Sequence, residues 1–159
     1  MSLEPGSEKH LLEFLRQSGD LSELGWRLIQ DFMQKWQLDA YEAILATNLI
    51  TEQRLAEVLA RQLKMDRLYS IRQLGVQQSD IKRLSFETAK RLQALVIGPD
   101  RNNGLEIVVA NPLKPGLKGE LAREVGEEIT LSVGERNDIV DAIDNLYPFE
   151  DQVPQIRPE

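Results

Sequence analysis

The sequence predicts an α+β protein in which a helical N-terminal subdomain, residues 1–65, precedes a small α/β subdomain, residues 66–147, with an antiparallel hairpin. Up to Met65 the apolar residues recur at spacings of three and four, as on amphipathic helices, whereas beyond it short apolar runs are typical of strands. Asn103-Gly104 separates two of these runs and is typical of a hairpin turn. Residues 148–159 contain three prolines and little to bury, so we expect a linker or a disordered tail.

Two helices are expected in the first part of the helical subdomain. The first spans about residues 7–16, with its apolar side chains on one face. The second begins after Asp20, a candidate N-cap with Glu23 three residues later, as in a capping box. Its wide apolar stripe is expected to be mainly core, with a partner-docking surface as the alternative. The stripe consists of Leu21, Leu24, Leu28, Ile29, Phe32, Met33 and Trp36.

A helical hairpin is expected at residues 39–63. The first helix covers residues 39–46, the chain turns at Thr47-Asn48, and Thr51 is a good N-cap for the second helix. The buried stripe of that second helix is expected to be Leu55, Val58, Leu59 and Leu63.

The second half is expected to contain short strands and helices. A brief strand at residues 66–71 is followed by two short helices opened by Ser79 and Ser85. Residues 95–97 and 105–109 are the two hairpin strands, and residues 117–125 form a helix. An alternating strand at residues 129–133 and a helix at residues 135–147 complete the subdomain.

Composition and motifs argue against several functions. The chain has 159 residues, no cysteine, a net charge of −7 and one histidine, His10, which we expect to be a solvated surface residue. This balance argues against a nucleic-acid-binding face, a disulfide framework and a metal site. No phosphate-binding loop, dinucleotide fingerprint or nucleophile elbow occurs, so we expect no catalytic residues, no cofactor and no enzyme activity. The alternative of an anion pocket would need Arg83, Lys90, Arg91 and Arg101 to gather.

No apolar run reaches the ~20 residues that span a bilayer, and the N-terminus lacks the pattern of a signal peptide. We therefore expect a soluble, cytoplasmic chain.

Several stretches carry a family resemblance. The hairpin stretch "AILATNLITEQRLAEVLARQLKMDRL", the strand at residues 95–99 and the run from Val109 to Pro112 occur in this order. The terminal helix follows, with Arg136, Asp138, Ile139, Ala142, Ile143 and Tyr147 at matching positions. Together, over residues 39–147, they resemble the N-terminal domain of the ATPases that power type II secretion and type IV pilus assembly.

The resemblance implies a non-catalytic regulatory module of a bacterial motor. In the family, the module precedes the ATPase core and docks the motor on the cytoplasmic domain of an inner-membrane platform protein. The chain would then be cytoplasmic and peripheral to the inner membrane through its partner. Large apolar side chains of the helical half are the expected contacts. The candidates are Leu11, Phe14, Leu28, Phe32 and Trp36.

The resemblance also raises cyclic di-GMP binding, which a subset of the family performs through a motif that starts Arg-Leu-Gly. Alignment on Gln62, with Leu55 and Leu59, places Asp39, Ala40 and Tyr41 at that tripeptide and Asn48 at a second glycine. A carboxylate there repels a dianionic ligand, and side chains replace glycines that allow close approach. We therefore expect no binding tighter than high micromolar. The alternative function is a cyclic di-GMP-sensing domain attached to another bacterial protein, such as a glycosyltransferase or a signalling protein.

Overall fold

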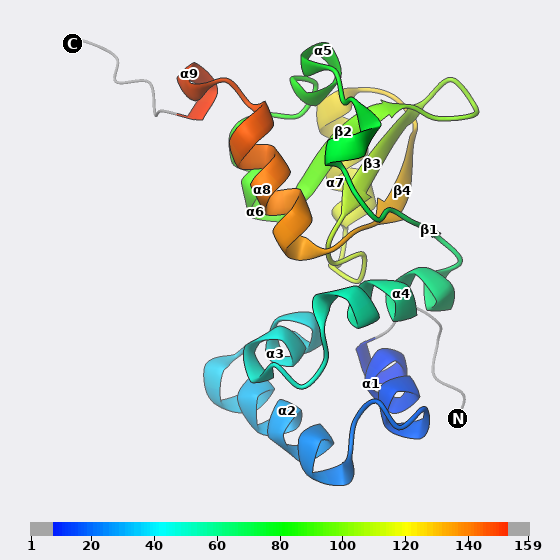
Figure 1. Ribbon diagram of the computed structural model, residues 1–159, viewed down its shortest axis with the longest axis vertical. Coiled ribbons are helices and arrows are strands. Elements are labelled where there is room, and N and C mark those ends of the chain that lie inside the picture. Colours follow the sequence, from blue (N-terminus) through cyan, green and yellow to red (C-terminus); the bar gives the residue numbers. More distant parts are fainter. Residues whose placement is uncertain (1–7, 153–159) are drawn as a thin grey trace, which may run out of the picture. The chain divides into compact units, whose positions relative to one another are not determined.

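The computed structural model describes residues 8–152 (Figure 1). The chain divides into two compact units, Met1–Met65 and Asp66–Glu159. The first consists of helices and the second contains a four-stranded sheet with helices around it.

The helical unit contains α1 (Glu8–Gln17), α2 (Glu23–Trp36), α3 (Ala40–Thr47) and α4 (Glu52–Leu63). Each helix contributes fully buried aliphatic side chains to one core, and these occur at the three- and four-residue spacing of a single helix face. The largest of them are Leu15, Ile29, Ile44, Leu55 and Leu59.

Local side-chain caps determine where the helices begin. Ser22, Asp39 and Thr51 each accept a hydrogen bond from the backbone N–H three residues later, at 3.0, 2.8 and 3.0 Å. The expectation that Asp20 caps the second helix is therefore wrong, since Ser22 has that role. Asp20 instead accepts two hydrogen bonds of 3.0 Å from the Arg54 guanidinium, which with a hydrogen bond from Ser18 lowers its carboxyl pKa.

The second unit begins with β1 (Asp66–Arg67), the 3-10 turn η1 (Arg72–Leu74), α5 (Gln78–Ile81) and α6 (Phe86–Leu92). It continues with β2 (Ala94–Pro99), β3 (Leu105–Val109), α7 (Leu117–Val125) and β4 (Ile129–Val133). It ends with α8 (Arg136–Leu146) and α9 (Phe149–Gln152).

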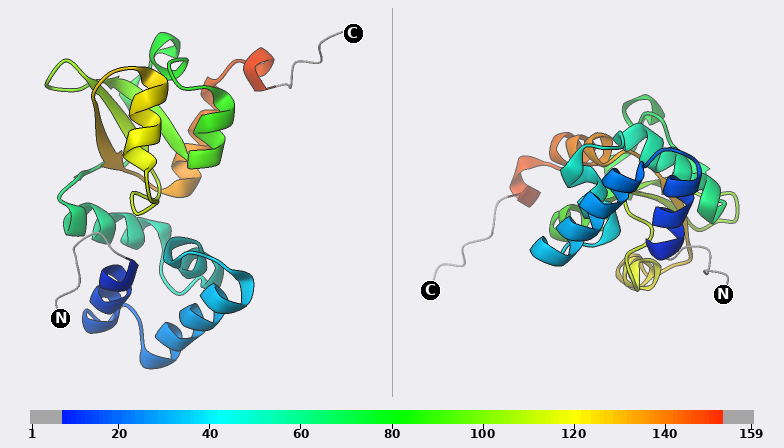
Figure 2. Two further views of the ribbon diagram at one scale, coloured as in Figure 1. Left: turned by 180° about the vertical axis from the view of Figure 1, so that it is seen from behind. Right: turned by 90° about the horizontal axis from the view of Figure 1, so that it is seen from below.

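The sheet is mixed, with the strand order β1-β4-β3-β2. β2 and β3 form the expected antiparallel hairpin, whereas β3 pairs with β4, and β4 with β1, in parallel. Parallel neighbours need a crossover connection, which α7 supplies between β3 and β4. In the left view of Figure 2, α7 (yellow) lies in front of the sheet and α8 (orange) lies behind the sheet, so the two helices cover opposite faces. Helix α6 packs against both β2 and α8.

The hairpin loop is longer than the tight reversal expected at Asn103-Gly104. Asn103 has a φ of +66°, but Gly104 does not have a positive φ. Gly104 is needed for a close approach instead, because a Cβ there would lie 2.5 Å from the Glu128 carbonyl oxygen. The Asp100 carboxylate accepts the N–H groups of Asn102 and Gly104 at 2.7 and 2.8 Å, which organises the loop.

Two further local expectations differ from the structure. Ser79 does not open a helix, because α5 begins at Gln78 and its N-cap, Gln77, makes no side-chain capping bond. Ser85 does cap α6, accepting from the Thr88 N–H. Within the expected tail, residues 149–152 form the short helix α9, and residues 153–159 lie outside the described part of the chain.

Tyr147 joins the end of α8 to the segment before α6. Its buried hydroxyl lies 2.8 Å from the Ile81 carbonyl oxygen and 2.7 Å from that of Leu84, so it donates a hydrogen bond shared by the two. Its ring contacts Phe86 edge to face, with 5.5 Å between centroids. Burial raises the pKa of Tyr147, and the negative charges of Glu124 and Asp151 raise it further.

Candidate functional site

One side of α2 exposes a row of large apolar side chains. Leu24, Leu28 and Trp36 are 78%, 40% and 60% exposed, and Phe32 is half-buried. The four residues are spaced four apart, so they form one continuous row along the helix. We call these four residues the α2 surface. The expectation that the apolar stripe of this helix is mainly core is wrong for this row.

The row is exposed because the apolar arc of α2 is wider than its contacts within the unit. Gly25 and Ile29 are buried on the neighbouring part of the helix surface. An extra methyl at Gly25 would lie 3.2 Å from the Leu49 side chain, so this glycine allows α2 to pack closely against the turn after α3. The contacts of α2 with α1 and α3 therefore leave the α2 surface uncovered.

A shallow hollow of about 600 Å³ lies on the C-terminal half of the α2 surface. Leu28, Phe32 and Trp36 line it together with Asp31 and Lys35. The Lys35 ammonium lies 5.3 Å from the centroid of the Trp36 ring, a cation–π contact that helps to hold the ring in place. The site is therefore an apolar patch with one residue of each charge at its rim.

The other two candidate contacts differ from this row. Leu11 is 2% exposed and belongs to the core, so we remove it from the proposed surface. Phe14 is half-buried on α1. Leu24, the most exposed of the aliphatic residues on α2, was not among the candidates, although its position four residues before Leu28 places it in the same row.

The residues aligned with the cyclic di-GMP motif have structural roles in the α3–α4 hairpin. Asp39 caps α3, and its Oδ1 accepts the Glu42 N–H. Tyr41 is 3% exposed. Asn48, aligned with the second glycine, has a φ of +55° and its N–H donates to the Leu45 carbonyl at 3.2 Å. Asparagine tolerates this left-handed conformation, so it fulfils the conformational role of a glycine there.

The end of the aligned motif is packed within the helical unit. Leu55 and Leu59 are buried at 1% and 0% exposure. The Gln62 side-chain oxygen is hydrogen-bonded to the His10 Nε2 at 2.5 Å. His10 is half-buried, so the expectation of a solvated surface histidine is wrong, because α1 packs within reach of the end of α4.

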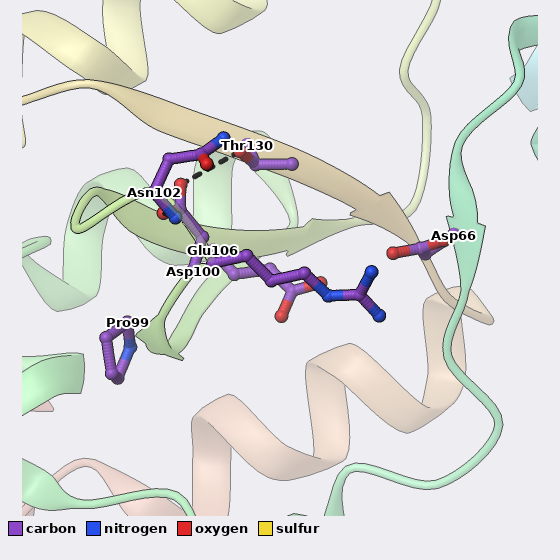
Figure 3. A pocket seen from close by; sticks show the side chains of 7 residues that line it. Asp66, Pro99, Asp100, Asn102, Glu106 and Thr130 are labelled. Atoms are coloured by element: carbon purple, nitrogen blue, oxygen red, sulfur yellow. Dashed lines mark hydrogen bonds between the residues drawn. The ribbon is translucent and has the colours of Figure 1, made fainter.

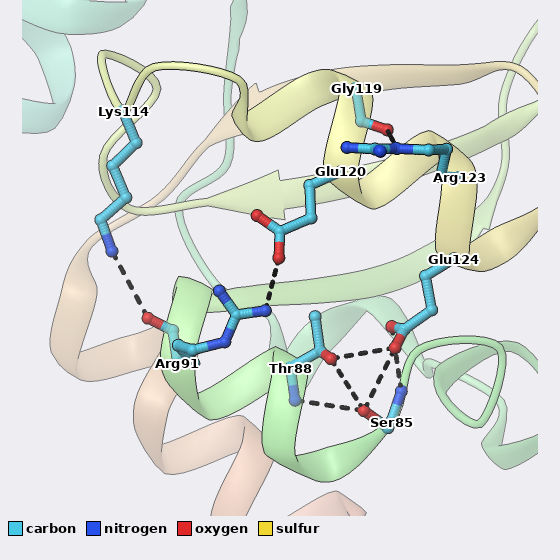
Figure 4. Close-up of polar contacts among 8 residues, drawn as sticks. All are labelled: Ser85, Thr88, Arg91, Lys114, Gly119, Glu120, Arg123 and Glu124. Atoms are coloured by element: carbon cyan, nitrogen blue, oxygen red, sulfur yellow. Dashed lines mark hydrogen bonds and ion pairs between the residues drawn. The ribbon is translucent and has the colours of Figure 1, made fainter.

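The basic side chains of the α/β unit do not gather into an anion pocket. Arg83 donates to the Glu127 carboxylate at 2.7 Å, and Lys90 and Arg91 pair with Asp144 and Glu120 at 2.8 and 2.5 Å. Figure 4 shows Arg91 and Glu120 bridging α6 and α7, beside a cluster in which the Glu124 carboxylate accepts from Ser85 and Thr88. Arg101 lines a different hollow. The ion pairs of Arg83, Lys90 and Arg91 therefore join neighbouring segments of this unit rather than form a ligand site.

That hollow, about 350 Å³, is acidic and lies beside the hairpin loop (Figure 3). Asp66, Asp100 and Glu106 line it with Arg101 and Thr130. Burial raises the pKa of Glu106, and the charges of Asp66 and Asp100 raise it further. The Asp100 carboxylate is already used by two backbone N–H groups and the Thr130 hydroxyl, which lower its pKa. Within residues 8–152 no group of three or more potential ligands is arranged to hold a metal ion.

No helix in the described part of the chain is long and apolar enough to cross a membrane.

A protein-family model, the MshEN domain, matches residues 62–153, which is more than half of the chain. The chain belongs to the MshEN domain family. This is the regulatory N-terminal domain of the ATPases of type II secretion and type IV pilus assembly, as the sequence resemblance predicts.

Solved structures show the same fold for this MshEN domain. The N-terminal domain of XpsE has a TM-score of 0.78 and 22% identity, covering 93% of this chain and 100% of that one. A second crystal form of it has a TM-score of 0.57 and 24% identity, covering 92% and 100%. The structure of MshE with cyclic di-GMP ("cdg") has a TM-score of 0.72 and 21% identity, covering 86% and 98%. These likenesses confirm the predicted α+β fold class. No match was found among curated proteins.

Proposed function

We propose that the chain docks a secretion or pilus-assembly ATPase on the cytoplasmic domain of an inner-membrane platform protein, through the α2 surface. The observation that carries the proposal is the row of exposed apolar side chains on one side of α2. An apolar row along a helix is suited to insertion into an apolar groove, or to packing against a second amphipathic helix. The contact would keep the MshEN domain peripheral to the inner membrane, with the ATPase core in the full-length chain.

The exposed area is large enough for a useful contact. Trp36 is 60% exposed. Taking a tryptophan side chain as roughly 200 Å², burial of the remaining ~120 Å² would stabilise a complex by about 3 kcal/mol. Tryptophan is enriched among interface hot-spot residues, and Leu28, Asp31 and Lys35 line the same hollow as Trp36, the two charged residues as a polar rim.

Calorimetric titration of the full chain with the cytoplasmic domain of its platform protein tests this proposal. Trp36→Ala and Leu28→Ala should each weaken binding by roughly tenfold or more, because each removes a side chain that the partner would bury. The matched control is Leu74→Ala, since Leu74 is also exposed, at 45%, but lies in the other unit. Unchanged affinity for the α2 variants, or equal loss for Leu74→Ala, would show that the contact lies elsewhere.

The proposed role is non-catalytic for this chain. The sequence has no phosphate-binding loop, and hydrolysis of ATP needs backbone donors, a lysine and a positioned metal around the phosphates. Purified chain should therefore show no turnover that rises with its concentration. ATP turnover that rises in proportion to the concentration of the chain would contradict the assignment of hydrolysis to the ATPase core alone.

Cyclic di-GMP sensing is the second candidate, and the specific observation in its favour is the fold shared with MshE, whose structure contains that ligand. The local residues oppose it here. Asp39 brings a carboxylate to the position of the motif arginine, and that carboxylate is committed to the α3 cap. Gln62 is hydrogen-bonded to His10. Loss of one charge-assisted contact alone costs about tenfold or more in affinity.

We therefore expect calorimetry with cyclic di-GMP to show binding no tighter than high micromolar. Asp39→Asn separates charge repulsion from the loss of the motif arginine, because asparagine also caps helices well. A sub-micromolar affinity for the unmodified chain would make ligand sensing the better function.

A further inference from the structure

A groove in the α/β unit lies between α8 and the segment of residues 70–76. Its volume is about 590 Å³, within the range of sites that hold a small ligand or a few side chains. The Ile71 N–H donates to the Asp138 carboxylate at 3.2 Å, which fixes the segment against α8. Both walls belong to the same unit. We call this feature the α8 groove.

The groove has an apolar floor and an acidic edge. Ile71 is 1% exposed, and Val76, Ala142 and Leu146 add further apolar surface. Asp138 and Asp141 line the α8 side, at the three-residue spacing that places them next to each other on one helix face.

The carboxylates of α8 differ in what they contact. Asp144 pairs with the Lys90 ammonium at 2.8 Å, and Asp138 holds the Ile71 N–H. The Asp141 carboxylate makes no hydrogen bond or ion pair with any residue between 8 and 152. Arg72 also lines the groove, and no ion pair joins it to Asp138 or Asp141. The edge therefore presents a carboxylate that no ion pair engages, beside an apolar floor.

We propose that the α8 groove binds a partner polypeptide through a lysine or arginine side chain flanked by aliphatic residues. Such a side chain has an apolar stem that can cover Val76 and Ala142 and a cationic head that can reach Asp141. Charge complementarity favours it over an acidic or neutral segment, because the groove edge and the chain as a whole, at −7, are both acidic. This site is separate from the α2 surface and does not depend on docking there.

Fluorescence anisotropy tests the proposal with a short fluorescein-labelled peptide that carries one lysine between leucines. Its control is the same peptide with glutamate in place of lysine. Saturable binding of the lysine peptide alone is expected. Asp141→Asn should weaken it roughly tenfold, because a hydrogen-bonded charge pair is lost. Asp144→Asn removes the same charge from the same helix outside the groove and should change binding less than about twofold.

The position of binding is mapped by amide chemical shifts of the full chain. Shifts confined to residues 70–76 and 138–146 are expected, and Ala142→Phe, which fills the groove, should abolish them. Absence of saturable binding at millimolar peptide would overturn the proposal. Equal losses for Asp141→Asn and Asp144→Asn, or shifts elsewhere, would also overturn it, because attraction would then be to the general acidity of the chain.

Discussion

Truncation of one residue on each side of α2 should separate core from docking surface. Ile29 is fully buried, whereas Leu24, five residues earlier on the same helix, is 78% exposed. Ile29→Ala removes buried methyl groups and leaves a cavity, so it should lower the free energy of unfolding by about 2–5 kcal/mol. Leu24→Ala loses little burial and places a better helix former on the surface, so its effect should stay within about 0.5 kcal/mol.

Tryptophan fluorescence during urea denaturation is the appropriate assay. The chain has two tryptophans, Trp26 and Trp36, and both lie on α2, so the signal reports unfolding of the helical unit alone. Platform binding should show the opposite ranking, with Leu24→Ala the more damaging variant under conditions where both are folded. Equal destabilisation by the two variants would refute the orientation of α2 and the docking proposal that rests on it.

Three further outcomes are expected. Tyr147→Phe should destabilise the α/β unit by about 1–3 kcal/mol, seen by hydrogen exchange, because two buried carbonyls lose their donor. Gly104→Ala should cost about 1–3 kcal/mol, because its Cβ would lie 2.5 Å from a carbonyl oxygen. The control Gly119→Ala, inside α7 with open space around it, should instead stabilise by up to about 1 kcal/mol in thermal unfolding. The Arg54 guanidinium lowers the pKa of the Asp20 carboxyl in the folded state. The pair therefore stabilises the fold fully at pH values above the unfolded-state pKa of about 3.9, and this stabilisation is lost as the pH falls through the folded-state pKa of Asp20. Arg54→Ala should therefore cost up to about 1 kcal/mol at neutral pH and nothing in strong acid, as measured by urea denaturation across pH.

The features that local sequence predicts well are those that local physics determines. Thr51 and Ser85 cap the helices that they were expected to open, because a hydroxyl needs only the N–H three residues away. The two strands of the hairpin and α7 also occur at the residues where the sequence predicts them, and the hairpin turn lies at the expected place between the strands.

The features that sequence did not predict depend on distant parts of the chain. Asp20 fits a capping box, but its partner is Arg54, on another helix. The parallel pairing of β3 with β4 cannot be predicted from the sequence of either strand, because the apolar side chains of a strand do not indicate in which direction its neighbour runs. The periodicity of α2 gives the width of its apolar arc, but the positions of α1 and α3 decide which part is covered. For this reason Leu24 was named only as one member of the stripe, and in the same way the packing around α1 buries Leu11, which the sequence left as a candidate contact.

Hydrogen exchange of the full chain, with and without the cytoplasmic domain of its platform protein, tests the docking proposal most directly. Slower exchange along α2 is expected in the complex, because a partner that contacts the α2 surface would suppress the local opening of that helix. The amides of β2 and β3 should be unaffected, since they belong to the other unit. A complex that protects only the α/β unit and leaves α2 exchanging as in the free chain would contradict it.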